Sequence, residues 1–470
     1  MNNSTVLLDG EDEDAYHIID DVKRYNHWMR YVEEAIGMNN YLRKLLLMLS
    51  PSKQILQLSQ HQQSMPISPE EWHIHWQKQN QPWRTEPEIL LARQKELSKR
   101  LAIVPNIEKG LYPFKGILLN RADIEWLLAT HENRRGPVDW SDEKQRNRKG
   151  LDLRGADLRY ADLQKLPLAR LRGALTWREA PDLTKEQRRA AEVLLEDANL
   201  KQTHLEGAIL AGVHLEKADL GRTRLEGAYL IRAHLEGAGL SEVHLERANL
   251  TGAYMERALL RRTYLADENH IGPRLVDIHW GDTNLAIVDW TQVKMLDDEH
   301  RARQKTYAGK VKDKVLRISE YETAVRANRQ LAVALENQGL NEDAARFAFR
   351  GQVLQRKLVW MRREFGRWSF SMMLALLTGY GYRMWRILVA YLLIISACAV
   401  AYFVLGIDYG PHLSLIQAFL ESITAFHGRV FFELFTSNTP QIWVTAFEAV
   451  AGLVIEGVFI AMLTQRFFGK

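Results

Sequence analysis

Leucine recurs at every fifth position over a long central part of the chain. Between residues 200 and 265, fourteen successive positions at this spacing hold leucine thirteen times and methionine once. Two residues before each of them stands a small residue, which is alanine, valine or threonine. An α-helix repeats about every 3.6 residues and a strand about every 2, so neither produces a period of five. The pattern predicts a chain that turns a corner every five residues and buries two of them on each side.

Four such sides close a coil of about 20 residues, and coils stacked at the strand spacing of about 4.8 Å would place the leucines in columns inside. The small residue is needed because a square interior has no room for two large side chains per side. The Ala-Asp-Leu units at 156–158 and 218–220 and the Ala-Asn-Leu unit at 248–250 resemble the pentapeptide-repeat family. The resemblance covers roughly residues 151–295 and implies a right-handed quadrilateral β-helix.

Helical signals interrupt and flank this array. The period breaks after Leu171, and residues 177–197 predict a helical insertion after which the array restarts. Upstream, residues 111–150 hold a short apolar run and a helical pattern, and we expect this strand and helix to cover the open end of the first coil. Downstream the period continues in degraded form, and Trp280 and Trp290 are expected to close the last coils. We assign residues 151–296 to the β-helix.

The first 110 residues are expected to form a helical region that is partly disordered. Their acidic start lacks an apolar core, and later segments such as residues 89–101 have helical periodicity. Pro69 marks the first position of another helix. His73 and His75 lie close together on it, but residues two apart on a helix do not face the same way. We therefore expect ordinary surface histidines there and no metal site.

Beyond the array the composition changes to long helices. Residues 321–336 and 341–363 have helical patterns, separated by Gly339, which ends a helix, and by Asn341, an N-cap residue. The pair resembles a single tetratricopeptide unit, which alone cannot bury a solenoid core, so we interpret it as a connector or an oligomer contact. Basic and aromatic residues then alternate, as in a helix on a membrane surface. Residues 297–385 are accordingly assigned to a helical hairpin and a membrane-surface linker.

The apolar residues concentrate in the last domain, 386–470. Residues 387–405 carry no charge, and both this segment and residues 442–463 are long enough to cross a hydrocarbon layer of roughly 30 Å. Eight basic residues lie between 350 and 386, whereas the connection 406–440 has only Arg429. By the positive-inside rule we expect a plasma-membrane protein with two crossings, both termini and the β-helix being cytoplasmic.

The connection between the crossings has an apolar run, His412 to Phe426, that is too short to span a membrane. The order of crossing, short apolar helix, glycine-containing turn and crossing resembles the two-transmembrane pore-loop module of potassium-channel-like proteins, over about 387–468. The resemblance implies an ion channel, a tetramer and a re-entrant helix. The filter candidates are Thr424, Ala425, Phe426, His427, Gly428 and Arg429. Of the Thr-Val-Gly-Tyr-Gly motif of potassium channels, this segment retains only a glycine, Gly428, so we expect no strong potassium selectivity.

Two acidic residues lie inside the second predicted crossing. Glu448 and Glu456 are eight residues apart with Gly452 midway, so they occupy neighbouring parts of one helical stripe. A charge at that depth costs about 2.5 to 3.5 kcal/mol unless it faces water or a partner. In a tetramer each would form a ring of four acids that favours cations, which makes all three residues pore-lining candidates. Pairing of the acids with Arg383, Arg386 or Arg466 at the membrane edge is the alternative.

The charge balance and the absence of catalytic motifs argue against several other functions. The chain has 62 basic and 58 acidic residues, and the array between 198 and 265 has eight acids against nine bases. A balanced surface imitates DNA poorly, so gyrase-directed DNA mimicry, known among proteins of this fold, is the least favoured function and a nucleic-acid partner is not expected. The lone Cys398 excludes a disulfide framework. No phosphate loop, nucleophile elbow or metal cluster is visible, so we expect neither an enzyme nor a cofactor.

These observations predict a multidomain membrane protein in which a cytoplasmic β-helix is joined by helices to a pore-loop module. The expected function is a weakly cation-selective ion channel whose β-helix acts as a scaffold or regulatory domain. Expected partners are the lipid bilayer, further copies of the chain, inorganic ions and a cytoplasmic protein bound to the β-helix. The alternative is a non-conducting, membrane-anchored scaffold for protein interactions.

Overall fold

The computed structural model describes residues 68–176, 178–179, 183–307, 309–378, 385–409, 413–428 and 440–468. The chain divides into two units, Met1–Glu71 and Trp72–Lys470, and almost all of the described residues belong to the second. Its first helices are α3 (Pro69–Lys78), α4 (Leu91–Leu101) and α5 (Arg121–Arg134). Pro69 is the first residue of α3, as the sequence indicates, and the Ser68 hydroxyl accepts a hydrogen bond from the Glu71 amide at 3.2 Å.

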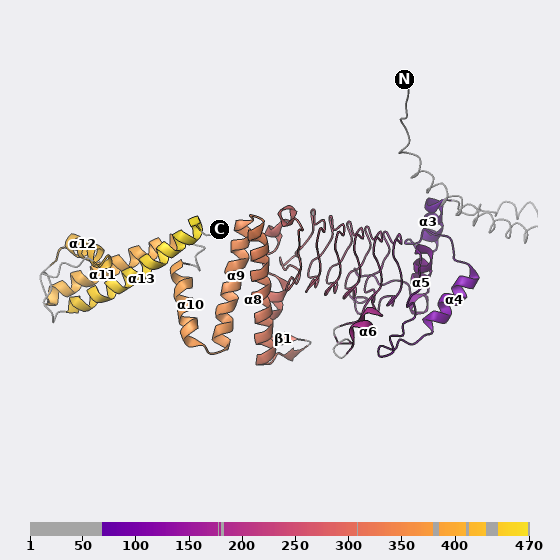
Figure 1. The fold of residues 1–470 in the computed structure, drawn as a ribbon, viewed down its shortest axis with the longest axis horizontal. Coiled ribbons are helices and arrows are strands. Elements are labelled where there is room, and N and C mark those ends of the chain that lie inside the picture. Colours follow the sequence, from indigo (N-terminus) through magenta and orange to yellow (C-terminus); the bar gives the residue numbers. More distant parts are fainter. Residues whose placement is uncertain are drawn as a thin grey trace, which may run out of the picture. The chain divides into compact units, whose positions relative to one another are not determined.

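Single-residue parallel bridges join each coil of the array to the next. Tyr229 bridges Ile209 on one side and Asn249 on the other, each 20 residues away. The amide of Leu230 donates to the Asn249 carbonyl at 2.8 Å, and the amide of Tyr229 donates to Ala208 at 2.8 Å. The leucines at 205, 210, 215, 220, 225 and 230 are completely buried. The predicted coil of four five-residue sides is confirmed, and Figure 1 shows the stacked coils between α5 and α8.

The corners of the coils explain the rest of the five-residue repeat. The position two residues after each central leucine or methionine from 200 to 260 lies in the left-handed region, for example Gly207 at φ 62° and Arg232 at φ 55°. Glycine adopts this conformation without strain, which is why it recurs there. Threonine replaces the small inward residue at 203, 223 and 263, and each hydroxyl is satisfied; that of Thr223, for instance, donates to the Leu200 carbonyl at 2.6 Å.

The insertion that interrupts the array is only partly helical. Asp157 bridges Leu194, which lies 37 residues further on instead of 20, so this turn of the coil contains 17 additional residues. Only α6 (Lys185–Arg189) is helical among its described residues, and it begins at a capping box made by Thr184. Val193 and the residues after it already belong to the coils, because they continue the buried inward columns. The helical part is therefore much shorter than the expected 177–197.

The N-terminal side of the array is covered by α5 and the segment before it. Ile124 and Leu127 of α5, together with Phe114, belong to the same buried core as Leu153 of the first coil. Leu118 forms a parallel bridge with Asp157 and so extends the first coil. These contacts remove the exposed coil end from water.

A helical hairpin covers the C-terminal side. The chain passes through η1 (Leu285–Ile287), η2 (Trp290–Gln292), α7 (Asp297–Arg303) and the short antiparallel pair β1 (Thr306–Tyr307) and β2 (Lys310–Val311). It then forms α8 (Lys314–Asn337) and α9 (Asn341–Met361).

The hairpin packs onto the last coil. Leu331 and Leu335 of α8 and Phe347 of α9 share one core with Leu285, and the rings of Trp290 and Phe347 meet edge to face at 6.1 Å. The hairpin is thus a cap of the β-helix, a role that the sequence did not indicate.

One detail of this hairpin differs from expectation. Gly339 ends α8 with a φ of 78°, as predicted, but Leu340 and not Asn341 occupies the N-cap position of α9 and makes no side-chain hydrogen bond there. The Leu340 amide instead donates back to the Leu335 carbonyl at 3.0 Å, which is the bond that closes a helix C-terminus. The short turn leaves no residue free to cap α9.

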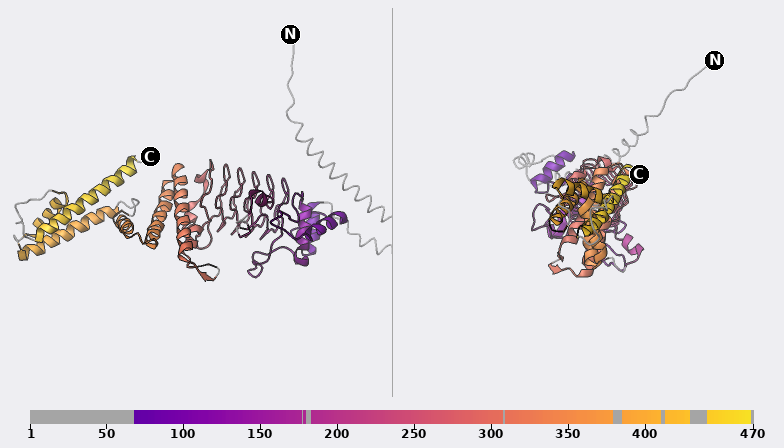
Figure 2. Two further views of the ribbon diagram at one scale, coloured as in Figure 1. Left: turned by 60° about the horizontal axis from the view of Figure 1, so that its bottom comes forward. Right: turned by 90° about the vertical axis from the view of Figure 1, so that its left-hand side faces the viewer.

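The remaining described helices are α10 (Phe365–Thr378), α11 (Trp385–Tyr409), α12 (Leu415–Phe426) and α13 (Pro440–Phe468). Within α11 and α13, the segments Arg386–Leu405 and Gln441–Ala461 are long and apolar enough to cross a membrane, while α12 is apolar but shorter. Figures 1 and 2 show α11 and α13 lying side by side, with α12 against them. These three helices contact one another directly and form the candidate site.

Candidate functional site

The short helix α12 is well defined at both ends. At its start, Ser414 and Gln417 form a capping box, with the Gln417 amide donating to the Ser414 hydroxyl at 3.3 Å and the Ser414 amide donating to the Gln417 side chain at 2.9 Å. At its end, His427 is the C-cap and Gly428 follows with a φ of 69°. A helix of 12 residues is about 18 Å long, which is too short to span a bilayer.

The two ends of α12 pack at different levels of the longer helices. Near its start, Ala418 packs against Tyr402 of α11, in a cluster that Val444 of α13 also touches. At its end, Phe426 packs against Ile455 of α13 and lies 4.9 Å from the ring of Tyr391.

The residues contacted at these two levels are 11 positions apart on each long helix. They are Tyr402 and Tyr391 on α11, and Val444 and Ile455 on α13. At 1.5 Å per residue this is about 16 Å along the helices. The helix α12 thus starts close to the ends of α11 and α13 that the connection joins, and it runs back alongside both.

Glu448 of α13 lies at the centre of this three-helix contact. Its side chain is fully buried and accepts a hydrogen bond from the hydroxyl of Ser422 on α12, which also lies 2.9 Å from the Ile395 carbonyl of α11. One level away, the hydroxyls of Tyr402 and Thr445 are 3.0 Å apart. The side chains of Tyr402 and Cys398 on α11 also interact with the Glu448 carboxylate. A buried polar line therefore connects all three helices.

The sequence pattern indicates Glu448 as a candidate but not Ser422, Tyr402 and Thr445, which lie around it. A signal was present for Ser422, because it lies four residues after Ala418 and four before Phe426. Those three residues share one face of α12 by helical periodicity, and all three are buried. Tyr402 and Thr445 carried no comparable signal, since nothing in the hydropathy of a long apolar helix distinguishes its faces.

The other candidates meet where α12 ends. His427 Nε2 lies 3.5 Å from a carboxylate oxygen of Glu456, and both side chains are somewhat more than two-fifths exposed. Gly452 touches the carbonyl of Phe426, and a Cβ atom at this position would clash with that oxygen. The structure therefore brings Phe426, His427, Gly452 and Glu456 together. Glu448 is separate from them, while Arg429 lies outside the described residues.

Apolar side chains cover the free faces of α12 and α13. Those that remain exposed include Leu415, Ile416, Phe419 and Leu420 on α12 and Trp443, Phe447, Val450 and Leu453 on α13. Contiguous apolar surface of this kind is characteristic of contact with lipid or with another protein surface. The partly exposed pair Glu456 and His427 lies next to it.

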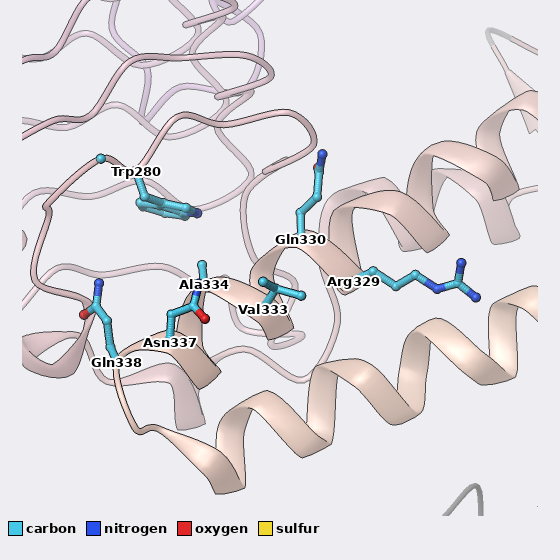
Figure 3. A pocket seen from close by; sticks show the side chains of 8 residues that line it. Trp280, Arg329, Gln330, Val333, Ala334, Asn337 and Gln338 are labelled. Carbon is cyan, nitrogen blue, oxygen red and sulfur yellow. The ribbon is translucent and has the colours of Figure 1, made fainter. Parts of the chain in front are cut away.

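A cavity of about 450 Å³ lies elsewhere, where the last coil of the β-helix meets α8 (Figure 3). Trp280 lines the cavity together with Gln330 of α8 and with Gln338, which follows the last residue of α8. These amides are engaged in docking the helix, because Gln330 donates to Asp277 at 3.0 Å and Gln338 donates to the Thr283 carbonyl at 2.8 Å. The cavity is part of the cap and contains no acid–base pair or nucleophile.

Comparison with known families agrees with the repeat pattern. Residues 191–227 and 228–265 match the family model of pentapeptide repeats, with eight copies. These residues are therefore pentapeptide repeats, as the sequence predicted. No curated protein matches the sequence.

Among solved structures, a pentapeptide repeat protein from the thylakoid lumen of Arabidopsis thaliana is 30% identical over 19% of this chain and 63% of its own, with a TM-score of 0.16. HetL, a pentapeptide repeat protein involved in heterocyst differentiation regulation in Nostoc, is 27% identical over 24% of this chain and 50% of its own, with a TM-score of 0.12.

QnrB1, a plasmid-mediated fluoroquinolone resistance protein, is 17% identical over 31% of this chain and 80% of its own, with a TM-score of 0.14. The chain thus spans less than two thirds of the length of the first two structures, and each of the three covers less than a third of this chain.

Proposed function

We propose that this protein is a membrane ion channel of the pore-loop type, with its β-helix as a scaffold or regulatory domain. The observation that carries the proposal is the packing of α12. A capped apolar helix, too short to span, runs back alongside two helices of membrane-crossing length. A re-entrant segment of this kind is tolerated in a membrane when it is buried in protein or lines a water-filled path.

In this proposal Glu456 and His427 are the polar groups at the end of the re-entrant helix. Both are partly exposed and lie next to each other, so in an assembly of several chains they can face a water-filled path. Glu448 has a different role, because its carboxylate is enclosed by α11, α12 and α13 of its own chain. It holds α12 in place, and the weak cation preference of the channel rests on Glu456.

The assembly is proposed to be a tetramer, whose subunits cover the apolar faces of α12 and α13 together with lipid. The distribution of basic residues supports cytoplasmic termini, since eight of them lie between 350 and 386, before and at the start of α11. This orientation places the β-helix in the cytoplasm. A partner that binds the β-helix can then bias the conformation of α11, which follows it in the chain through α8, α9 and α10.

The decisive experiment is current recording from the purified full-length protein in planar bilayers under a salt gradient. We expect current with a reversal potential displaced modestly toward the cation equilibrium potential. Glu456→Gln should reduce this displacement, because it removes the exposed acid, whereas Glu242→Gln, on the outside of the β-helix, should leave it unchanged. A reversal potential on the anion side, abolished by Arg429→Gln, would show that a basic ring controls selectivity.

Topology is tested separately from conduction. A cysteine introduced at Ser437 should react with a membrane-impermeant thiol reagent on intact cells, whereas one at Thr251 should react only after lysis. Labelling of the Thr251 variant alone on intact cells would place the β-helix outside and reverse the orientation.

A non-conducting, membrane-anchored scaffold is the second candidate. It is favoured by the β-helix, whose long regular exterior presents charges in local pairs such as Lys201–Asp219 at 2.7 Å and Arg222–Glu242 at 2.8 Å. Such neutralised pairs also disfavour DNA mimicry, which needs an uncompensated acidic surface. Absence of current for a correctly inserted, assembled protein would establish this candidate in place of the channel.

A further inference from the structure

One face of the β-helix stacks histidines and glutamates in register from coil to coil. Residues that follow each other at intervals of 20 occupy equivalent places in successive coils. His214 and His234 therefore lie one above the other, and their rings are parallel within 3° at a centroid distance of 4.8 Å. Glutamates that follow central leucines lie beside them. We refer to Glu196, His214, Glu216, His234 and Glu236 as the His–Glu column.

The hydrogen bonds of this column use only half of each carboxylate. Nδ1 of His214 lies 2.8 Å from Oε1 of Glu216, and Nδ1 of His234 lies 3.2 Å from Oε1 of Glu236. The second oxygens of Glu196, Glu216 and Glu236 are buried and have no hydrogen-bond partner within the described residues. Buried polar atoms in folded proteins almost always have a partner, and the second oxygens of Glu206, Glu226 and Glu246 on the opposite face lack one among the described residues in the same way.

The same atoms are spaced as metal ligands. One group consists of Glu196, His214 and Glu216, and a second consists of Glu216, His234 and Glu236. Within each group the potential ligand atoms lie within 4.8 Å of one another, and Glu216 belongs to both groups. Imidazole nitrogen combined with carboxylate oxygen suits Zn²⁺ and neighbouring transition ions better than Mg²⁺ or Ca²⁺, which prefer oxygen alone.

The opposite face provides an internal comparison. Glu226, His244 and Glu246 form a third group with the same donor atoms. There Arg224 lies 3.1 Å from Glu226 and 3.2 Å from Glu206, so a permanent cation already neutralises part of the acidic charge. Among the described residues, Glu216 and Glu236 instead form their ion pairs with His214 and His234, and the charge of Arg159 acts on Glu196 from beyond ion-pair distance. The shared glutamate of the His–Glu column, Glu216, thus has no lysine or arginine within ion-pair distance among the described residues.

We propose that the His–Glu column is a binding site for a divalent transition-metal ion of the Zn²⁺ type, with Glu216 as the shared ligand. The ion takes nitrogen from His214 or His234 and oxygen from the glutamates, and it supplies the partner that the buried carboxylate oxygens lack. Binding would link neighbouring coils and stabilise the folded array by mass action. This site is independent of ion conduction by the membrane helices.

The test is a titration of the purified full-length protein in detergent with Zn²⁺ against a chromophoric chelator. Glu216→Gln should weaken binding at least tenfold, since it removes a ligand from both groups. Glu196→Gln should weaken binding less, because the group with His234 stays intact. Glu226→Gln, on the face with Arg224, is the matched control and should bind as the wild type does. Glutamine preserves size, and circular dichroism in the absence of metal verifies that each variant is folded.

A second readout is the melting temperature with and without Zn²⁺. We expect Zn²⁺ to raise it in the wild type and in Glu226→Gln, and not in a His214→Ala/His234→Ala variant that is folded without metal. Equal Zn²⁺ affinity of the wild type and Glu216→Gln would overturn the proposal. So would a loss of affinity in Glu226→Gln as large as that in Glu216→Gln, because the binding would then not belong to this column.

Discussion

The β-helix and the three helices α11, α12 and α13 both bury apolar side chains, but their sequences specify them to very different degrees. In the β-helix, every fifth residue enters the same environment, so Leu230 is buried between Leu210 and Leu250 of the adjoining coils. In α13, by contrast, neighbouring apolar residues have different environments, for Ile455 is buried while Leu453 is exposed. The five-residue repeat therefore predicts which side chains are buried, whereas a long apolar run predicts only the length of a helix.

The acids show the same contrast. Glutamates of the β-helix occupy equivalent corners, and their surroundings repeat from coil to coil. Glu448 and Glu456 lie on one helix and were expected to behave alike. The structure instead buries Glu448 against Ser422 and leaves Glu456 partly exposed beside His427. Whether each acid is buried or exposed therefore depends on which residues pack against its side of α13.

The largest expected effect comes from breaking a column of the β-helix. Leu230→Asp places an unpaired charge in a core that is closed on all sides, and we expect a loss of about 5 kcal/mol or more in the free energy of unfolding. Leu259→Asp is the matched control, because Leu259 belongs to the same array but is 59% exposed. Thermal melting and limited proteolysis of the full-length variants measure the difference. Similar melting of the two would be incompatible with a buried leucine column.

The packing of α12 against α13 is tested by substitutions at two glycines of α13. A Cβ atom at Gly452 would collide with the Phe426 carbonyl, whereas one at Gly457 would meet no atom within 4 Å. Gly452→Ala should therefore displace α12 and cost about 1 to 3 kcal/mol through overpacking. Gly457→Ala should be neutral or slightly stabilising, as expected for alanine in a helix. Melting in detergent checks both, and a greater loss in Gly457→Ala would point instead to a contact between subunits.

A smaller effect is expected at the C-terminal cap, where Asp298 is buried under the last coil. Burial raises the pKa of Asp298 from 3.8 to about 6, against the opposing effect of Arg274. The folded state thus favours the protonated acid, so this contribution to stability is complete below about pH 4 and is lost as the pH rises through 6.

Asp298→Asn cannot ionise but can still accept the hydrogen bond from the Leu275 amide, which is 2.9 Å long in the wild type. We expect the stability of the wild type relative to this variant to fall by about 2 kcal/mol between pH 4 and pH 7.5. Denaturant unfolding across this range measures the difference. The exposed Asp282→Asn should show no such trend, and a relative stability of wild type that rises with pH would reverse the assigned sign.

The smallest effect is expected at a corner glutamate. One carboxylate oxygen of Glu226 lacks a hydrogen-bond partner among the described residues, and the other lies 3.1 Å from Arg224, which is itself 46% exposed. Because the exposed ion pair contributes little and the unpartnered oxygen opposes folding, Glu226→Ala should change the melting temperature by less than about 2 °C. A large loss would mean that the corners stabilise the array as much as its leucines do.

The sequence by itself determined the β-helix, because a strict period of five fixes which residues face inward, where the corners lie and how coils register. It also identified the two long apolar segments, their lengths and the short apolar run between them. Only the tertiary structure decided that α8 and α9 cap the last coil through Phe347 and Leu335. It alone placed Ser422 on Glu448 and His427 beside Glu456. The helical periodicity of these segments can indicate which residues are buried, but it does not record which neighbour the buried face meets.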